Sequence, residues 1–186
     1  MQRLSNYFYT KSSFLVFLIS LALFVVFLVL VLPSEAEKSA SMTDSGQSPD
    51  TSFYYTRDEL YQMAEDFGQE GRYYYLDSRI TFDIIWPLVY AVFLINSISW
   101  ILDKTIMEGS PLRLLNLTPL AAILFDFLEN ISNMVVMFRY PTQTDILASL
   151  AGIITSLKWI FVGGSFVILV LGVLLWIAVK INLIKT

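Results

Sequence analysis

The sequence predicts an all-α polytopic membrane protein, a four-transmembrane-helix bundle with a short outer amphipathic helix. Of its 186 residues, 56% are hydrophobic and 15% are charged, whereas soluble domains have about 45–50% and about 25%. The apolar residues gather in four blocks, each long enough for a helix to cross a bilayer, which takes about 20 residues. One of these blocks carries regularly spaced polar side chains, and this pattern predicts packing against other helices rather than against lipid.

The first apolar block covers residues 14–32 and defines an N-terminal anchor helix within residues 1–33. The competing interpretation is a cleaved signal peptide, because Ser34-Glu35-Ala36 resembles a signal-peptidase site. The apolar stretch is longer than the 7–15 residues usual for a signal peptide. The length therefore favours a retained anchor, which we expect at the periphery of the bundle because its side chains are uniformly bulky.

Residues 34–80 form an acidic extracytoplasmic segment with ten carboxylates and four basic side chains. Residues 34–50 are small and polar, which is typical of a flexible linker. Thr56 and Glu59 then fit a capping box, and apolar side chains follow at helical spacing. We expect an amphipathic helix at about 56–68 that lies on the outer face of the bilayer or caps the bundle.

Residues 81–186 are predicted to form a three-helix membrane core, with spans at about 82–102, 114–138 and 146–179. The last block is about 50 Å of helix at 1.5 Å per residue, more than a bilayer core of about 30 Å. It is therefore tilted or projects at one end. Small residues recur every four positions in it and predict close approach by the third helix or another subunit; they are Ala148, Gly152 and Ser156.

Basic residues near the spans predict the orientation, because cytoplasmic loops carry an excess of lysine and arginine. One side of the predicted topology has Arg3, Lys11, Lys104, Arg113, Lys180 and Lys185. The other side has Lys38, Arg57, Arg72, Arg79 and Arg139, mostly in one long loop that counts less. We therefore expect a multi-pass protein of the plasma (inner) membrane with both termini in the cytoplasm.

A polar stripe marks the third span. Asp126, Glu129, Asn130 and Asn133 have the spacing 0, 3, 4 and 7, which places all four on one helix face. An ionised carboxylate at the centre of a transmembrane helix costs about 2.5–3.5 kcal/mol on insertion scales. We therefore expect this face to meet other helices or a wet cavity.

Lys158 is the expected partner of the stripe. Asp126 lies thirteen residues before Arg139, and Lys158 thirteen residues after Asp145, so both are about 20 Å from the connecting turn. Thr155 lies one turn before Lys158 and can hydrogen-bond to the surplus acid. The cluster is either an ionic clasp that fixes helix register or a proton, ion or ligand site, and the sequence leaves both open.

The second span adds secondary polar positions at Asp83, Tyr90 and Asn96. Arg79, four residues before Asp83, can pair with it at the outer boundary of the membrane. We expect these groups to serve packing rather than a pore or a binding site.

The sequence contains no cysteine and no histidine, which excludes thiol catalysis, histidine acid–base chemistry and the usual zinc and haem ligands. No glycine-rich phosphate loop is present, and no basic patch indicates nucleic-acid binding. We assign no catalytic residue, metal site or cofactor from the sequence.

Four stretches, DELYQMAEDFGQEGR, TFDIIWPLVY, TPLAAILFDFLEN and TSLKW, resemble a family of uncharacterised four-helix integral membrane proteins of prokaryotes. The resemblance covers roughly residues 55–176. The resemblance implies a four-helix membrane fold in which FDFLEN and TSLKW belong to one unit. No activity is known for the family, so none is implied for this chain.

Two function classes remain open from the sequence. The favoured class is a non-catalytic membrane protein, serving as an accessory subunit of a larger membrane complex or binding a small hydrophobic ligand or lipid. The expected partners are then the bilayer, a membrane protein or a second copy of the chain, and no nucleic acid. The alternative is a proton-coupled carrier or intramembrane enzyme that uses Asp126, Glu129 and Lys158. Four spans without an apparent inverted repeat favour the first class.

Overall fold

The structure is a computed structural model that describes residues 1–181, and every regular element in that range is a helix. The all-α prediction is therefore confirmed for the described chain. Four helical runs are long and apolar enough to cross a membrane, namely Phe14–Ser41, Gly68–Asp103, Pro111–Arg139 and Asp145–Lys180. Lys185, one of the residues that predict the orientation, lies outside the described residues.

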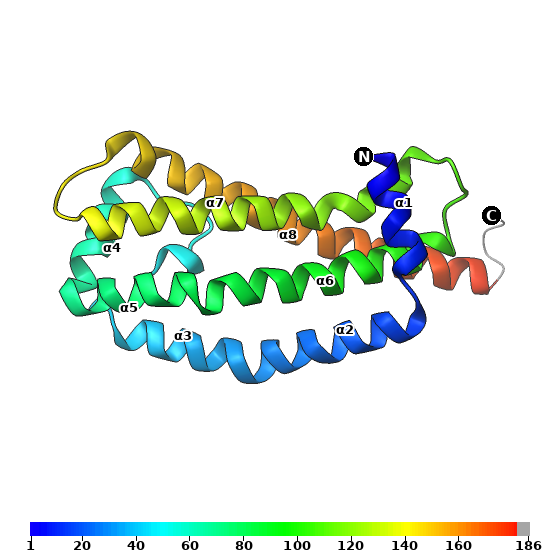
Figure 1. Cartoon of the computed structure of the whole chain (residues 1–186), viewed down its shortest axis with the longest axis horizontal. Coiled ribbons are helices and arrows are strands. Elements are labelled where there is room, and N and C mark those ends of the chain that lie inside the picture. Colours follow the sequence, from blue (N-terminus) through cyan, green and yellow to red (C-terminus); the bar gives the residue numbers. More distant parts are fainter. Residues whose placement is uncertain (182–186) are drawn as a thin grey trace. The chain divides into compact units, whose positions relative to one another are not determined.

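Two compact units make up the chain, and each is assembled from separate stretches of sequence. Unit 1 contains Met1–Val25, Val89–Ala122 and the chain from Ile160, and unit 2 contains Val26–Leu88 and Ile123–Trp159. The three longest helices, α6 (Phe82–Asp103), α7 (Thr118–Arg139) and α8 (Asp145–Lys180), contribute residues to both units (Figure 1).

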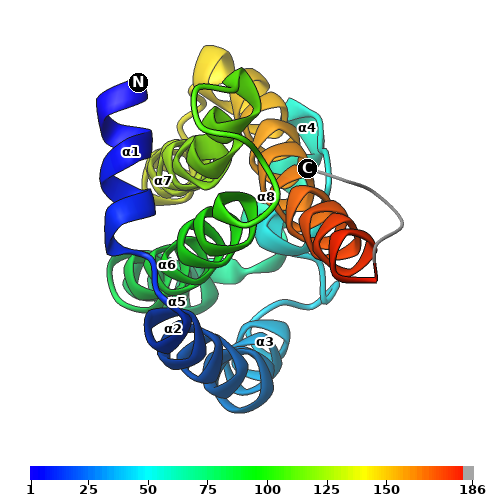
Figure 2. The ribbon, with the colours of Figure 1, turned by 90° about the vertical axis from the view of Figure 1, so that its right-hand side faces the viewer.

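Unit 1 includes a helix that the sequence does not predict, α1 (Gln2–Lys11), which lies against the 3₁₀ segment η3 (Pro111–Leu117). In Figures 1 and 2, α1 runs across the direction of the part of α6 that belongs to the same unit. Ser5 Oγ donates to Asn116 Oδ1 at 2.8 Å, and Tyr9 Oη donates to the Arg113 carbonyl oxygen at 2.8 Å. Burial raises the pKa of Tyr9 to about 12, so at neutral pH its hydroxyl keeps the proton that it donates.

Aromatic stacking joins α2 (Phe14–Val26) to α6 within unit 1. Phe24 stacks on Phe93 with ring centroids 4.5 Å apart, and Phe17 stacks on Trp100 at 5.4 Å. Most of the other large side chains of α2 are exposed, which is consistent with the peripheral position expected for this block. Helix α8 closely approaches α6, because a Cβ added at Gly172 would lie 2.8 Å from Ile101.

Unit 2 corrects the expectation of a flexible linker at residues 34–50. Helix α2 continues through a π-helical turn, η1 (Phe27–Val31), into α3 (Leu32–Ser41). The chain then folds back through the short 3₁₀ segment η2 (Pro49–Thr51), where Ser48 and Pro49 are buried. The small polar side chains predict a solvated chain. Instead, Ser48 is buried and Asp50 pairs with Arg79 of α5, so the segment is ordered by contacts with residues later in the chain.

The amphipathic helix is present as α4 (Arg57–Asp66), and both hydrogen bonds of the predicted capping box at Thr56 and Glu59 are formed. Leu60 and Ala64 are fully buried and belong to a core cluster with Val136 and Ala151. Within unit 2, α4 therefore caps α7 and α8, the second of the two positions expected for it. Gly68, with φ of 58°, separates α4 from α5 (Gly68–Ile80), as its left-handed conformation allows.

Candidate functional site

The polar stripe of α7 faces the interior of unit 2. Asp126, Glu129, Asn130 and Asn133 are all buried, and Glu129 and Asn133 are fully inaccessible. Their spacing on one helix face therefore predicted correctly that they do not face outward. Close contacts with α8, α5, α6 and the 42–56 segment define the buried polar network; its members are Asp50, Tyr55, Arg79, Asp83, Asp126, Glu129, Asn130, Asn133, Thr155 and Lys158.

The ion pair between α7 and α8 joins Lys158 Nζ to Glu129 Oε2. Thr155 Oγ1 lies 2.8 Å from the other carboxylate oxygen, Glu129 Oε1. Both partners of the ion pair are more than nine-tenths buried, and the ammonium also lies 4.8 Å from the centroid of the Trp159 ring. The sequence-predicted residues Glu129, Thr155 and Lys158 are thus in mutual contact.

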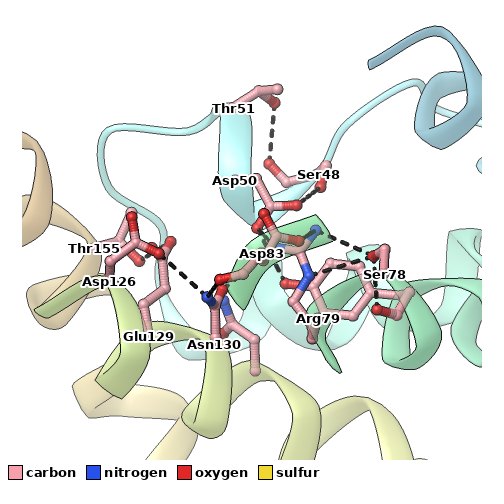
Figure 3. Close-up of polar contacts among 12 residues, drawn as sticks. Ser48, Asp50, Thr51, Ser78, Arg79, Asp83, Asp126, Glu129, Asn130 and Thr155 are labelled. Carbon is pink, nitrogen blue, oxygen red and sulfur yellow. Dashed lines mark hydrogen bonds and ion pairs between the residues drawn. The ribbon is translucent and has the colours of Figure 1, made fainter. Parts of the chain in front are cut away.

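Asp126 occupies a different part of the network. Its Oδ1 accepts a hydrogen bond from Asn130 Nδ2 at 3.2 Å (Figure 3). The same amide nitrogen lies 3.3 Å from the backbone carbonyl oxygen of Asp83. In a regular helix that carbonyl would accept from residue 87, but Pro87 has no N–H. Asn130 therefore supplies a donor that the α6 backbone lacks.

A second buried cation, Arg79 of α5, joins the network. Its guanidinium pairs with Asp83 at 2.7 Å, as the spacing of four residues predicts, and also with Asp50. It lies 4.3 Å from the centroid of the Tyr75 ring, and its Nη1 is 3.4 Å from Asn130 Oδ1. Arg79 is 93% buried, because the 42–56 segment with Asp50 folds over it.

Tyr55, like Asp50, is a network residue that the sequence did not predict. Its hydroxyl donates to Asn133 Oδ1 at 2.9 Å and accepts from Thr155 Oγ1 at 2.9 Å. Burial, together with the negative charge of Glu129, raises the pKa of Tyr55 above its ordinary value. The hydroxyl is therefore a neutral donor and acceptor in the centre of unit 2.

The small-residue face of α8 receives this segment rather than a helix. A Cβ added at Gly152 would lie 1.9 Å from the Tyr55 carbonyl oxygen. Ser156 Oγ donates to the Phe53 carbonyl oxygen at 3.0 Å, and Trp159 Nε1 donates to that of Ser52 at 2.9 Å. The small residues thus allow another part of the same chain to pack closely against α8. That part is the extended backbone of residues 52–55, and the spacing of small residues alone does not reveal whether a helix or an extended segment packs there.

The secondary positions separate between the two units. Asp83 belongs to the network, whereas Tyr90 and Asn96 are part of unit 1. Tyr90 is buried there, and Asn96 accepts a hydrogen bond from Ser12 Oγ at 3.1 Å and donates one to the Val92 carbonyl oxygen at 2.8 Å. These contacts serve packing within unit 1.

Charge does not balance in the network. Four carboxylates, from Asp50, Asp83, Asp126 and Glu129, accompany the two cations Arg79 and Lys158. No group of three or more Asp or Glu side chains among residues 1–181 is arranged to hold a metal ion. The two surplus carboxylates are chemically able to take up protons.

An open groove lies on the α5–α7 side of unit 2. It has a volume of about 520 Å³ and is lined by Tyr73, Leu76, Asp77, Ile80, Met134, Val135 and Phe138. Volumes of roughly 300–1,000 Å³ are usual for sites that hold small ligands. The lining is apolar apart from one carboxylate and one phenol, so its chemistry fits an alkyl chain.

Compared with protein-family models, curated proteins and solved structures, the chain has no match. The resemblance to prokaryotic four-helix membrane proteins therefore remains an expectation, and the function of the chain rests on the geometry of the network and the groove.

Proposed function

We propose that the chain is a non-catalytic multi-pass membrane protein that binds a lipid chain in the groove between α5 and α7. The observation that carries the proposal is the apolar, open groove of about 520 Å³. Tyr73, Ile80 and Phe138 are each more than half exposed beside it. In a bilayer, such a surface is covered by lipid, and its concave shape favours one chain held in place over lipid that exchanges freely.

Membrane insertion and orientation are part of the proposal. Among the described residues, unit 1 contains five basic and two acidic side chains, whereas unit 2 contains six basic and fourteen acidic ones. The positive-inside rule then favours a cytoplasmic location for the N-terminus and the loop at residues 104–110. Helix α4 and the 42–56 segment lie at the outer face of the inner membrane in this orientation.

A non-catalytic role is supported by the partners of the buried charges. Both cations, Arg79 and Lys158, are engaged by carboxylates of the same unit. Tyr55 is 1% exposed and hydrogen-bonds to α7 and α8. These contacts hold the 42–56 segment on the helices, which is a structural task.

Photocrosslinking tests the lipid proposal. The full chain is reconstituted in phosphatidylcholine bilayers that contain a phospholipid with a diazirine on its acyl chain, and labelled peptides are identified by mass spectrometry. We expect labelling concentrated at residues 134–138. Val135→Trp, which fills the groove, should abolish this concentration, and Ile153→Trp, at a half-exposed position on α8 outside the groove lining, should not.

Two results would contradict the proposal. Labelling of equal density around α7 and α8 would mean that the groove holds no particular lipid. A stoichiometric membrane protein that copurifies and shields residues 134–138 would instead indicate an accessory subunit, whose partner helix occupies the groove.

The surplus of carboxylates in the network favours a second candidate, a proton-coupled carrier or intramembrane enzyme that uses Asp126, Glu129 and Lys158. Transport of protons by the full chain in sealed vesicles, lost on Glu129→Gln, would support this candidate over the first.

A further inference from the structure

Four buried groups in unit 2 form one continuous chain of hydrogen bonds. Glu129 Oε1 lies 2.8 Å from Thr155 Oγ1, Thr155 Oγ1 lies 2.9 Å from Tyr55 Oη, and Tyr55 Oη lies 2.9 Å from Asn133 Oδ1. None of the four residues is more than 1% exposed. Water therefore does not compete for these contacts, and each must contain a hydrogen supplied by one of its own partners.

The number of hydrogens available in this chain is limiting. Each hydroxyl has one hydrogen to donate, and an amide oxygen has none. Tyr55 donates to Asn133 Oδ1, and Thr155 donates to Tyr55. The Thr155 oxygen is also 3.0 Å from the Ala151 carbonyl oxygen and 2.8 Å from Glu129 Oε1, so its one hydrogen has three possible acceptors. The remaining contact, between Thr155 and Glu129, is complete when the Glu129 carboxyl supplies the hydrogen.

The chain has a second complete arrangement in the opposite direction. Asn133 Nδ2 is buried and has no acceptor among residues 1–181. A half-turn of the amide exchanges its nitrogen and oxygen, after which Nδ2 donates to Tyr55, Tyr55 to Thr155, and Thr155 to Glu129. Every contact then contains a hydrogen while Glu129 is an ionised carboxylate. The two arrangements differ by one proton.

Charged groups from all neighbouring elements surround Glu129. Lys158 of α8 pairs with its other oxygen, and Asp126 lies one turn away on α7. The remaining groups of the network are Asp50, Arg79 of α5 and Asp83 of α6, with Tyr75 beside the guanidinium. With all carboxylates ionised the network has an excess of two negative charges, which burial disfavours, so one added proton relieves it.

We propose that Glu129 is a buried proton-binding site whose occupancy sets the direction of the hydrogen-bond chain to Asn133. The proton is taken from water and returned to it, and the only covalent bond that forms or breaks is the O–H bond of the carboxyl group. The Asn133 amide and the two hydroxyls turn in response. This site is separate from the lipid groove, and its test does not depend on lipid binding.

Infrared spectroscopy of the full chain in lipid bilayers tests the proposal, because a protonated carboxyl has a C=O band distinct from that of a carboxylate. Glu129 is the glutamate of the network, and the other three acids are aspartates. We expect a protonated-carboxyl band that is lost as pH rises, shifts when glutamate is labelled with ¹³C, and disappears in Glu129→Gln. Glu70→Gln, at an exposed carboxylate of α5 outside the groove and the network, is the matched control and should leave the band unchanged.

Tyr55→Phe tests the chain itself. Without the phenol, the Thr155 hydrogen can serve the Glu129 carboxylate directly, which favours the ionised form. We expect the midpoint of the titration to fall by about one pH unit, a tenfold loss of proton affinity. The isotope experiment needs no substitution, and a labelled-glutamate band that persists at neutral pH is expected from the buried Glu129 rather than from the six solvent-accessible glutamates. The absence of a protonated-carboxyl band, a band insensitive to labelled glutamate, or an unchanged midpoint in Tyr55→Phe would overturn the proposal.

Discussion

At the scale of single residues, two buried cations connect the elements of unit 2. Lys158 joins α8 to α7 through Glu129, and Arg79 joins α5 to the 42–56 segment through Asp50. Buried pairs contribute little net stability compared with apolar residues of the same volume, but removal of one partner strands a charge. The main effect of the two cations is therefore to determine which segments pack against each other, and not to raise the overall stability.

A double-mutant cycle on Glu129 and Lys158 measures this dependence. We expect Lys158→Met to lower the free energy of unfolding by about 3–5 kcal/mol, because it strands the Glu129 carboxylate. Glu129→Gln should cost less, because three carboxylates still accompany the two cations, and the double variant should lose less than the sum of the two. Denaturant titration in detergent gives the three values. Additive losses would mean that the two groups do not interact.

The exposed pair Arg57–Asp145 provides a control cycle. Its shortest N–O distance is 3.6 Å, and both side chains are about half exposed. Water screens such a pair, so its coupling should be much smaller than that of Glu129 and Lys158. A coupling here as large as that of Glu129 and Lys158 would show that the cycle measures something other than buried charge.

The sequence could predict one half of the network and not the other. The helical spacing of the α7 stripe and the matching depth of Lys158 are local quantities, and both lead to residues that meet. Asp50 and Tyr55 come from a polar, irregular segment with no periodicity. Their positions depend on contacts with residues such as Gly152, about a hundred positions later, which no local pattern encodes.

At the scale of elements, the closest approach in unit 2 is between α8 and the extended backbone at residues 52–55. Gly152 makes it possible, since any Cβ there would overlap the Tyr55 carbonyl oxygen. The same helix has Gly163, where an added Cβ meets nothing within 4 Å. Substitution at Gly163 changes only the helix propensity, whereas substitution at Gly152 also changes the contact with Tyr55. Comparison of the two positions therefore separates these two effects on stability.

Substitution by alanine should therefore have opposite signs at the two positions. Gly163→Ala should raise the thermal midpoint, because alanine is favoured over glycine in a helix by about 0.5–1 kcal/mol. Gly152→Ala should lower it, because the carbonyl must move away and the Tyr55 hydrogen bonds stretch. Thermal unfolding in one detergent compares them, and a stabilised Gly152→Ala variant would mean that the segment does not lie against α8.

The predictable elements are those with strong local signals. The capping box of α4 and the apolar runs of α6, α7 and α8 lead to helices close to their expected bounds. The first run continues as a helix to Ser41, beyond its expected end, and α5 was not expected. Helix α1 and the order of residues 34–50 were missed. The first depends on buried hydrogen bonds from Ser5 to η3, and the second on the pairing of Asp50 with Arg79, so both are consequences of tertiary contacts.

At the scale of the whole molecule, the distribution of charge is the property that bears on membrane topology. Basic side chains dominate unit 1, and acidic side chains dominate unit 2. A polytopic protein with this asymmetry should insert with the loop at 104–110 in the cytoplasm. Its four candidate spans then require the turn near Thr142 and the segment near Ser45 to share the opposite side.

Single cysteines can test this topology without background, because the natural chain has none. Substitutions at Ser45, Met107 and Thr142 fall on exposed positions, and Met107 is 74% exposed. In intact cells, a thiol reagent that cannot cross the membrane should label cysteine at Ser45 and at Thr142, whereas cysteine at Met107 should react only after the membrane is opened. Labelling at Thr142 but not at Ser45 would leave an odd number of crossings between them and refute the four-span arrangement. Labelling at Met107 alone would retain the four spans but reverse the orientation, and the charge asymmetry would then have another cause.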